Sequence, residues 1–494
     1  MKELKKYNMY INGEWTPSSD GKYFKSYNPA SGEAWCEVAE ATAEDVDRAV
    51  KAAQDAFENS EWTNMTYTQR GRLVSKLGDL IADNVEELAT FETTDNGKLI
   101  REMRGQLSYL PEFYYYFGGL ADKIQGSTLP IDKRDMFAFT TREPLGVVAA
   151  ITPWNSPLYL TTLKLAPALV AGNTIVIKPS EVTSASLLEL VRLVEEAGFP
   201  PGVVNVVTGF GKPAGEALTT HPLVRKIAFT GGEESARHVV RNSAENFAQL
   251  SLELGGKSPN IVFEDADPDN AAMGIIAGIF GASGQSCVAG SRAFLHTNIY
   301  DRVIERLIDR VQSIKIGDPL QDETEMGPLA TEAQLKRVEK YVELGKQEGG
   351  HLIYGGKKPA RLEKGWYFEP TIFEHTDNQS KITREEVFGP VLSVIPFRDE
   401  AEAIQLANST DYGLAAGIWA RDISKAHRVA KAVRAGIVWV NTYRSISPIA
   451  PIGGSGLSGY GREGGYEAIY DYTQSKVVWV NTSSEPIPDP FIMR

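Results

Sequence analysis

The chain has 494 residues, of which 42% are hydrophobic, and this length predicts about three domains or lobes. Lys and Arg number 51 against 64 Asp and Glu, giving a net charge of −13, which argues against a protein that tracks nucleic-acid phosphates. The apolar stretches fall short of the roughly 18 residues of a membrane span, and the polar start has no apolar signal core. We therefore expect a cytoplasmic protein that binds neither nucleic acid nor membranes.

Cysteine and histidine usage limits the chemistry further. Cys36 and Cys287 are the two cysteines in the sequence, so a disulfide framework is excluded. The six histidines form no i, i+4 pair, and there is no Cys-x-x-Cys motif. We therefore expect no metal site.

The first elements along the chain are predicted to be helices. Thr42 and Asp45 have the spacing of a capping-box variant, and apolar residues then recur at helical intervals through residues 46–57. Residues 69–94 follow the same periodicity, and Gly97 marks the end of that helix.

From Gly146 onward, short apolar runs alternate with helical windows. The runs at 147–151, 174–177, 203–207 and 227–229 are typical of strands buried on both faces, and 184–197 is a helical window. This β-α-β order predicts a parallel sheet with helices on both faces. A strand at 260–263, a helix at 268–282 and a strand at 292–296 predict a second α/β lobe.

Two further segments alternate at period two, at residues 137–141 and 476–480. Exposed strands have unsatisfied backbone groups at their edges. We therefore expect these strands to pair with another chain.

A glycine-rich turn follows the run at 203–207 and contains Gly209, Gly211 and Gly215. Free N–H groups at such a turn hold a pyrophosphate in dinucleotide-binding folds, although turn glycines also serve purely structural ends. Lys178 and Glu181 lie at the end of an upstream strand. In dinucleotide-binding folds, residues at this place distinguish a ribose with free hydroxyl groups from one that carries a 2′-phosphate. The alternative is that both are solvated loop charges.

Three residues are candidates for catalysis, each with a structural alternative. Cys287 lies in a Gly- and Ser-rich turn, where it is either a nucleophile or inert packing. Glu253 ends an apolar strand before two glycines. It is either a general base with a raised pKa or a structural carboxylate. Asn155 lies between two prolines, as an oxyanion donor or a turn former. Cys36 lies in an alternating strand-like run and is interpreted as inert.

Taken together, these motifs resemble the NAD(P)-dependent aldehyde dehydrogenase superfamily over essentially the whole chain. The matching segments follow the family's order: Pro153-Trp-Asn155, Ala171-Gly-Asn-Thr174, Lys178-Pro-Ser-Glu181, Phe229-Thr-Gly231, Leu252-Glu-Leu-Gly-Gly256, Gly284-Gln-Ser-Cys287, Glu386-Val-Phe-Gly-Pro390 and Ser458-Gly-Tyr-Gly-Arg-Glu463. Two positions depart from the family pattern. Gly232 stands where a Ser often contacts the pyrophosphate, and the Lys often found between Gly454 and Ser458 is missing.

The resemblance implies an α/β fold with a Rossmann-like cofactor lobe, an α/β catalytic lobe and a β oligomerisation arm. The expected boundaries are 1–122 and 145–252 for the cofactor domain, 253–457 for the catalytic domain, and 123–144 with 470–494 for the arm. It implies NAD as cofactor, with NADP possible, and a homodimer or homotetramer. The implied cofactor-binding residues are Ile151, Thr152, Pro153, Trp154, Lys178, Ser180, Glu181, Gly211, Gly215, Phe229, Thr230, Gly231, Gly232, Leu254, Gly255, Glu386 and Phe388.

The resemblance also implies a reaction, in which an aldehyde is oxidised to its acid through a thiohemiacetal and a thioester on Cys287. Asn155 and the Cys287 N–H would hold the oxyanion, and Glu253 would activate the hydrolytic water. CoA-acylating relatives generally lack this acid, so hydrolysis is expected. Two alternatives stay open: a non-catalytic structural or binding protein on the same scaffold, and a thiol esterase.

Substrate size is predicted from positions where small-aldehyde relatives often carry aromatics. Here these positions are Ser156, Leu163 and Gly281, which predicts a bulky or aromatic aldehyde unless Tyr159 or other aromatics refill the space. The expected substrate-pocket residues are Ser156, Tyr159, Leu163, Gly281, Ser286 and Val288.

Overall fold

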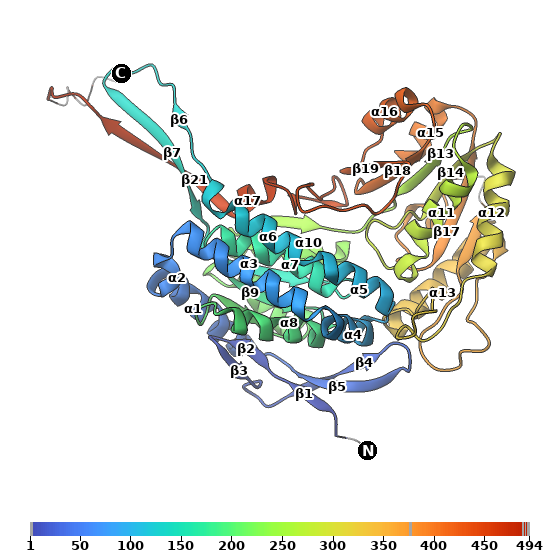
Figure 1. Cartoon of the computed structure of the whole chain (residues 1–494), viewed down its shortest axis with the longest axis horizontal. Helices are drawn as coiled ribbons and strands as arrows, with labels where there is room; N and C mark the ends of the chain where they lie inside the picture. The colour runs from blue at the N-terminus through green and yellow to red at the C-terminus, as the bar shows by residue number, and fades with distance from the viewer. Residues whose placement is uncertain (1–2, 375–377, 487–488, 490, 492–494) are drawn as a thin grey trace.

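The computed structural model describes residues 3–374, 378–486, 489 and 491. Within these residues the chain forms an eight-stranded sheet, a seven-stranded sheet and two three-stranded sheets. The two large sheets lie in separate lobes, and a long β arm projects from the first lobe (Figure 1). The predicted α/β fold is confirmed.

The eight-stranded sheet has a parallel centre made of the predicted buried strands. Its order is β20-β12-β11-β8-β9-β10-β2-β3, with the outer strands β20, β2 and β3 antiparallel to their neighbours. The parallel strands are β8 (Val147–Thr152), β9 (Thr174–Pro179), β10 (Val204–Val206), β11 (Val224–Thr230) and β12 (Gln249–Glu253). The outer strands are β2 (Met9–Ile11), β3 (Glu14–Thr16) and β20 (Gly459–Tyr460).

Helices cover both faces of this sheet, as the β-α-β order predicts. One apolar core lies under α3 (Tyr67–Asp83), α4 (Val85–Asn96), α5 (Ile100–Tyr109), α6 (Pro111–Leu120), α7 (Pro157–Val170) and α8 (Ser184–Ala197). The other lies under α1 (Ala43–Asn59), α9 (Glu216–Thr220) and α10 (Glu233–Asn242). The short helix α2 (Glu61–Asn64) follows α1. The predicted capping box at Thr42 and Asp45 is present at the start of α1.

The prediction of one helix over residues 69–94 is wrong, because α3 and α4 are separate helices. Asn84 ends α3, where its backbone N–H bonds the Ile81 carbonyl and its side-chain amide donates to the Leu80 carbonyl at 2.8 Å. Asn side chains compete for backbone groups in this way. Gly97 ends α4 in the left-handed conformation at φ 78°, as expected for a C-terminal glycine.

The seven-stranded sheet forms the second lobe, in the order β15-β16-β17-β14-β13-β18-β19, with the edge strand β15 antiparallel. Its strands are β13 (Pro259–Val262), β14 (Arg292–His296), β15 (His351–Tyr354), β16 (Thr371–Glu374), β17 (Val391–Phe397), β18 (Ala415–Trp419) and β19 (Ile437–Val440). Its helices are α11 (Pro268–Ile279), α12 (Tyr300–Gln312), α13 (Glu332–Gln347), α14 (Lys381–Arg384), α15 (Glu400–Ala407) and α16 (Ile423–Ala432). The helix predicted for 268–282 thus ends at Ile279, before a short 3-10 turn, η4 (Gly281–Gly284).

The arm is built from the two period-two segments. β7 (Met136–Pro144) and β21 (Thr473–Asn481) pair antiparallel along their whole length, and β6 (Thr128–Leu129) flanks β7. Both predicted strands therefore exist, and they pair with each other within the chain. The last small sheet contains β1 (Lys5–Tyr7), β4 (Tyr23–Asn28) and β5 (Glu33–Ala39), and Cys36 is fully buried in β5. None of the helices in the described part of the chain has the length and apolar character to cross a membrane.

Candidate active site

The carboxyl ends of four parallel strands of the first lobe meet in one region. β8 precedes Asn155, β9 precedes Glu181, β11 precedes Gly231, and β12 ends at Glu253. Because the carboxyl ends of parallel strands meet at one edge of a sheet, segments far apart in sequence come together there.

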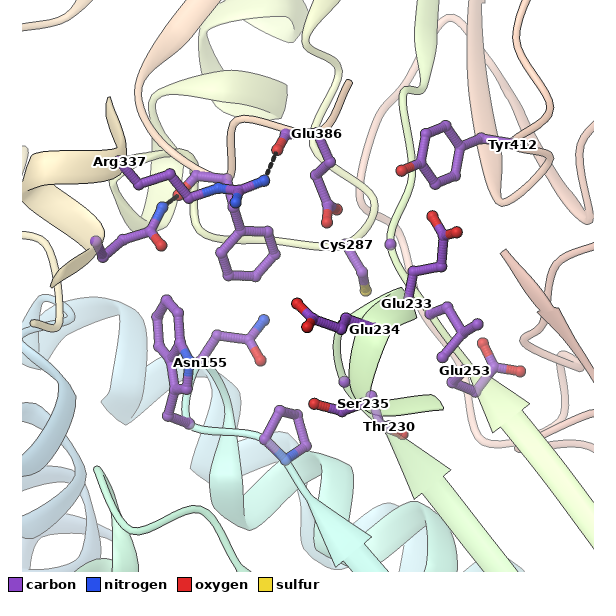
Figure 2. A pocket seen from close by; sticks show the side chains of 18 of the residues that line it. Asn155, Thr230, Glu233, Glu234, Ser235, Glu253, Cys287, Arg337, Glu386 and Tyr412 are labelled. Carbon is purple, nitrogen blue, oxygen red and sulfur yellow. Dashed lines mark hydrogen bonds between the residues drawn. The ribbon is translucent and has the colours of Figure 1, made fainter. Parts of the chain in front are cut away.

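The second lobe supplies loops to the same region. Cys287 lies between η4 and β14, and Glu386 and Phe388 lie between α14 and β17. Figure 2 shows Asn155, Glu253 and Cys287 directed into one cavity, with the Cys287 sulfur between the other two side chains. The site is therefore assembled by both lobes.

Two adjoining cavities, of about 580 Å³ and about 500 Å³, form the site. They share Trp154, Thr230 and Gly232 among their lining residues, so they make one elongated trough. The trough extends from Cys287 to Lys178 and Glu181. This shape suits a long ligand with one end at the thiol.

Every residue expected to bind the cofactor lines one of these two cavities. The larger cavity contains Leu254, Gly255, Glu386 and Phe388. The other contains Ile151, Thr152, Pro153, Trp154, Lys178, Ser180, Glu181, Gly211, Gly215, Phe229, Thr230, Gly231 and Gly232. The fold thus brings together the residues that were expected to bind the cofactor. Their binding roles stay a prediction.

The middle of the trough fits an anionic group. α10 begins directly after Gly232, with no side-chain cap, and Gly232 and Ser235 line both cavities. A Cβ at Gly232 would meet nothing within 4 Å. The first N–H groups of a helix attract phosphates, so this position suits a pyrophosphate.

One end of the trough carries opposite charges. Burial lowers the pKa of Lys178 to about 8, although the Glu181 carboxylate opposes that shift. The Lys178 ammonium donates to the Pro179 carbonyl at 3.0 Å. A lysine beside an acid at this strand end suits a sugar bearing hydroxyl groups.

The other end of the trough has a rigid wall. The Trp154 and Phe388 rings meet edge to face, with centroids 5.2 Å apart. Phe388 has a positive φ of 58°, which is rare for a bulky residue. The Gln334 amide donates to the Phe388 carbonyl at 2.6 Å, and the Arg337 guanidinium donates to the Glu386 carbonyl at 2.6 Å (Figure 2). These bonds hold the loop in place.

Glu386 is also fixed from the first lobe, because its carboxylate accepts the Gly256 N–H at 2.9 Å. A Cβ at Gly255 would lie 2.3 Å from that carboxylate, so the strand end and the acid pack without room for a side chain. Burial raises the pKa of Glu386 to about 7.

The surroundings of the Cys287 thiol disfavour its ionised form. Burial, followed by the carboxylates of Glu253 and Glu386, raises the pKa of Cys287 to about 12. The backbone N–H groups of Val288 and Cys287 act in the opposite direction. A nucleophilic thiolate therefore requires a nearby base.

Glu253 is the titratable carboxyl best placed for that task. Burial and the neighbouring Glu463 carboxylate raise its pKa well above its usual range, while Lys164 lowers it. Its Oε1 atom has no hydrogen-bond partner among the described residues. A desolvated, unsatisfied carboxyl of this kind is a candidate general base.

Asn155 is held in place by the loop that carries the nucleophile. Its Nδ2 donates to the Gln285 carbonyl at 3.0 Å, and the side chain is buried. An amide NH₂ group has two donor hydrogens, so one stays available for an oxyanion near Cys287.

The expected substrate-pocket residues do not line the two cavities of the trough. Tyr159 packs edge to face on Phe113, at 5.5 Å between centroids, in a cluster with Leu163. At Gly281, a Cβ would lie 2.4 Å from Arg444 Nη1. The remaining expected residues lie near the nucleophile: Ser286 is next to Cys287 in the chain, and Val288 accepts a hydrogen bond from the Tyr443 hydroxyl.

Side chains from elsewhere therefore occupy the space that the small residues leave. Arg444 fills the position beside Gly281, and Tyr159 with Phe113 fills the position beside Leu163. The prediction of a bulky or aromatic aldehyde assumed empty apolar volume at these positions, and other side chains occupy that volume. The preference for large substrates stays a prediction.

Several residues of the site escaped the sequence reasoning. The larger cavity is also lined by Glu233, Glu234, Gln334, Arg337 and Tyr412 (Figure 2). The glutamates follow the Phe229-Thr-Gly231 motif, which was the available signal. The other three come from helical and loop segments without a local motif.

A buried ion pair lies beside Glu253 and was also missed. Lys164 pairs with Glu463, and its ammonium also donates to the Thr230 hydroxyl at 2.6 Å. Both charged side chains are nearly inaccessible to solvent. Lys164 gave no sequence signal, because an isolated Lys in an apolar helix has no characteristic spacing.

Comparison with known proteins identifies the family. Residues 15–478 match the model of the aldehyde dehydrogenase family. The (Z)-2-((N-methylformamido)methylene)-5-hydroxybutyrolactone dehydrogenase of Acinetobacter baylyi is 52% identical, over 99% of this chain and 100% of the relative. The hydroxyisobutyraldehyde dehydrogenase of Mycolicibacterium austroafricanum is 43% identical, over 97% and 94% of the two chains.

A solved structure agrees in three dimensions. The NAD⁺ complex of an aldehyde dehydrogenase from Bacillus cereus has a TM-score of 0.95 and 45% identity, and covers 97% of both chains. The predicted resemblance is thereby confirmed, and the chain belongs to the aldehyde dehydrogenase family.

Proposed function

We propose that this enzyme oxidises an aldehyde to a free carboxylate through a covalent intermediate on Cys287, with NAD as cofactor. The observation that carries this proposal is the convergence of Cys287, Glu253 and Asn155 on one cavity. That cavity continues into a trough with the shape and donor groups for a dinucleotide.

The first step is attack of the Cys287 sulfur on the aldehyde carbonyl carbon. Glu253 takes the thiol proton, because a raised pKa makes its carboxylate a stronger base than an ordinary one. The carbonyl oxygen becomes an oxyanion, which accepts hydrogen bonds from the Asn155 amide and the Cys287 N–H. Each such donor contributes on the order of 3 kcal/mol.

The second step converts the thiohemiacetal into a thioester, and NAD, when bound, accepts the hydride that this oxidation releases. Trp154, Glu386 and Phe388 would hold the nicotinamide end of the cofactor. Glu253 releases the thiol proton to solvent and then takes a proton from water, whose oxygen attacks the thioester carbon while the Cys287 sulfur leaves and is reprotonated. Aldehyde, NAD⁺ and water thus yield carboxylate, NADH and two protons, and the thiol is regenerated.

Two alternatives are separated by simple assays. A non-catalytic protein on the same scaffold would bind NAD without oxidising any aldehyde. The presence of Cys287, Glu253 and Asn155 together favours catalysis over this alternative. A thiol esterase would turn over activated esters without any nicotinamide. NADH absorbance across an aldehyde panel, with ester hydrolysis measured in parallel, distinguishes all three.

The proposed cofactor preference is NAD over NADP. Glu181 lines the end of the trough, where its carboxylate accepts bonds from ribose hydroxyls and repels a 2′-phosphate. The proposed substrate is an aromatic or bulky aliphatic aldehyde, with kcat/KM at least tenfold higher than that of acetaldehyde. An aldehyde panel in which acetaldehyde gives the highest value would contradict this.

We also propose that the chain assembles as a homodimer or homotetramer through the arm. β21 is the outer strand of its sheet, and its Val477, Trp479 and Val480 side chains are exposed. An exposed apolar edge strand readily pairs with another chain. Light scattering after gel filtration would give a monomer mass if this is wrong.

Cys287→Ser tests the core of the proposal. We expect loss of dehydrogenase activity with NAD binding retained, since a hydroxyl is a far weaker nucleophile than a thiolate. Retention of more than a trace of kcat would refute the assignment.

A further inference from the structure

A group of polar side chains lies beside Asn155 but outside the lining of the trough. This polar cluster consists of Lys98, Glu102, Gln106, Ser156 and Arg444. Glu102 and Gln106 are one turn apart on α5, Lys98 precedes that helix, Ser156 precedes α7, and Arg444 follows β19. None of the five lines either cavity of the trough.

Contacts place the cluster next to the reacting thiol. The Lys98 ammonium donates to the Ser156 hydroxyl at 2.7 Å and to Gln106 Oε1 at 3.3 Å. Ser156 follows Asn155, whose amide is bonded to the loop of Cys287. Burial lowers the pKa of Lys98, and the carboxylates of Glu92 and Glu102, followed by Cys287, oppose that shift. Arg444 lies beside Gly281 and Glu102 accepts the Ala282 N–H, so the cluster packs against the segment that leads to Cys287.

The cluster holds more hydrogen-bond donors than the described residues satisfy. An ammonium has three N–H donors, and Lys98 uses two of them. The buried Nε2 of Gln106 has no partner among the described residues. Arg444 donates to the Ala277 carbonyl at 3.2 Å, which leaves most of its five N–H groups for another acceptor.

Acidic groups offset part of this positive charge. Glu102 accepts the Ala282 N–H at 3.3 Å, and its other oxygen is buried without a partner in the described chain. Burial raises the pKa of Glu92 to about 7, so near neutral pH it bears only part of a charge. The basic side chains of Lys98 and Arg444 thus lie near two acidic side chains, Glu92 and Glu102.

We propose that the polar cluster binds a carboxylate on the substrate, so that the preferred aldehydes are semialdehydes of dicarboxylic acids. A carboxylate offers two acceptor oxygens and a negative charge, which matches the unused donors of Lys98, Gln106 and Arg444. The inference rests on the proposed aldehyde oxidation at Cys287. Its product would be a dicarboxylate.

Matched substrates test this inference on the whole enzyme with saturating NAD. The pairs are succinic semialdehyde against butanal, and adipic semialdehyde against hexanal, each scored by kcat/KM. We expect at least one carboxylated member to exceed its uncharged partner by tenfold or more. Equal or higher values for both uncharged aldehydes would overturn the inference and leave the proposed function standing. Oxidation of no aldehyde would overturn the proposed function itself.

Variants then assign the preference to the cluster. Lys98→Met keeps the length of the side chain and removes its charge, and we expect it to lower kcat/KM at least tenfold more for the carboxylated aldehyde than for its partner. Lys340→Met, on the exposed face of α13, is the matched control and should leave the ratio unchanged.

Gln106→Glu provides an independent test of carboxylate binding if Lys98→Met folds poorly. The added carboxylate should raise KM selectively for the carboxylated aldehyde, because like charges repel. If neither variant changes the ratio of the two substrates, the cluster does not bind the carboxylate and the inference is wrong.

Discussion

Replacing Glu253 by Gln separates the two half-reactions of the proposed mechanism. Gln has nearly the same shape, so it fits the same buried position at the end of β12, but it cannot take a proton. A positioned general base contributes about 10²- to 10⁴-fold. We therefore expect steady-state kcat to fall by about 100-fold or more, because thioester hydrolysis needs this base.

The rate of the first turnover should fall much less than the steady-state rate. The Glu253 carboxylate is one of the groups that raise the pKa of Cys287, so its neutralisation makes the thiolate easier to form. That gain opposes the loss of a proton acceptor. We expect a burst of NADH approaching one per active site, with its rate reduced less than tenfold.

Rapid mixing with absorbance detection of NADH measures both phases. Wild-type kcat should rise with pH as Glu253 loses its proton, since burial and Glu463 raise the pKa of that carboxyl. The variant should lose this rise. Equal losses in burst rate and steady-state rate would contradict this prediction, because formation of the thiolate would then depend on Glu253 as strongly as thioester hydrolysis does.

Three further predictions concern the cofactor and the second cysteine. Gly232→Ser should lower the Kd for NAD about two- to tenfold by calorimetry, because a hydroxyl fits the open space there and one hydrogen bond is worth about 0.5–1.5 kcal/mol. Glu181→Gln should narrow the preference of kcat/KM for NAD over NADP, since a like-charge contact with the 2′-phosphate costs about 1 kcal/mol; a higher value for NADP in the wild type would contradict this. Cys36→Ser should keep kcat within twofold while lowering the free energy of unfolding by about 1–3 kcal/mol, because Cys36 is fully buried; a large loss of kcat would give this thiol a role that we exclude.

Local patterns were sufficient to predict much of the fold. Continuous apolar runs predict β8, β9 and β11 because strands covered on both faces need apolar residues throughout. The break between α3 and α4 was missed because Asn84 interrupts a periodic segment through its own backbone contacts. Period two predicts β7 and β21 as strands but does not reveal that they pair with each other, since pairing depends on the tertiary fold.

The candidate site shows the same division between local and distant information. The ends of parallel strands meet by topology, so Asn155, Glu181 and Glu253 were accessible from sequence. Arg444 fills the space beside Gly281 from a loop that follows β19. No local pattern relates these two residues, and the same holds for the pair of Lys164 and Glu463.

Mass spectrometry of a quenched reaction tests the central claim most directly. Glu253→Gln enzyme is mixed with aldehyde and NAD, stopped with acid and digested. We predict that the peptide containing Cys287 gains the mass of the acyl group only when NAD is present, and that the peptide containing Cys36 does not. An unmodified Cys287 peptide after a full burst of NADH, or an acyl group on another residue, would contradict it.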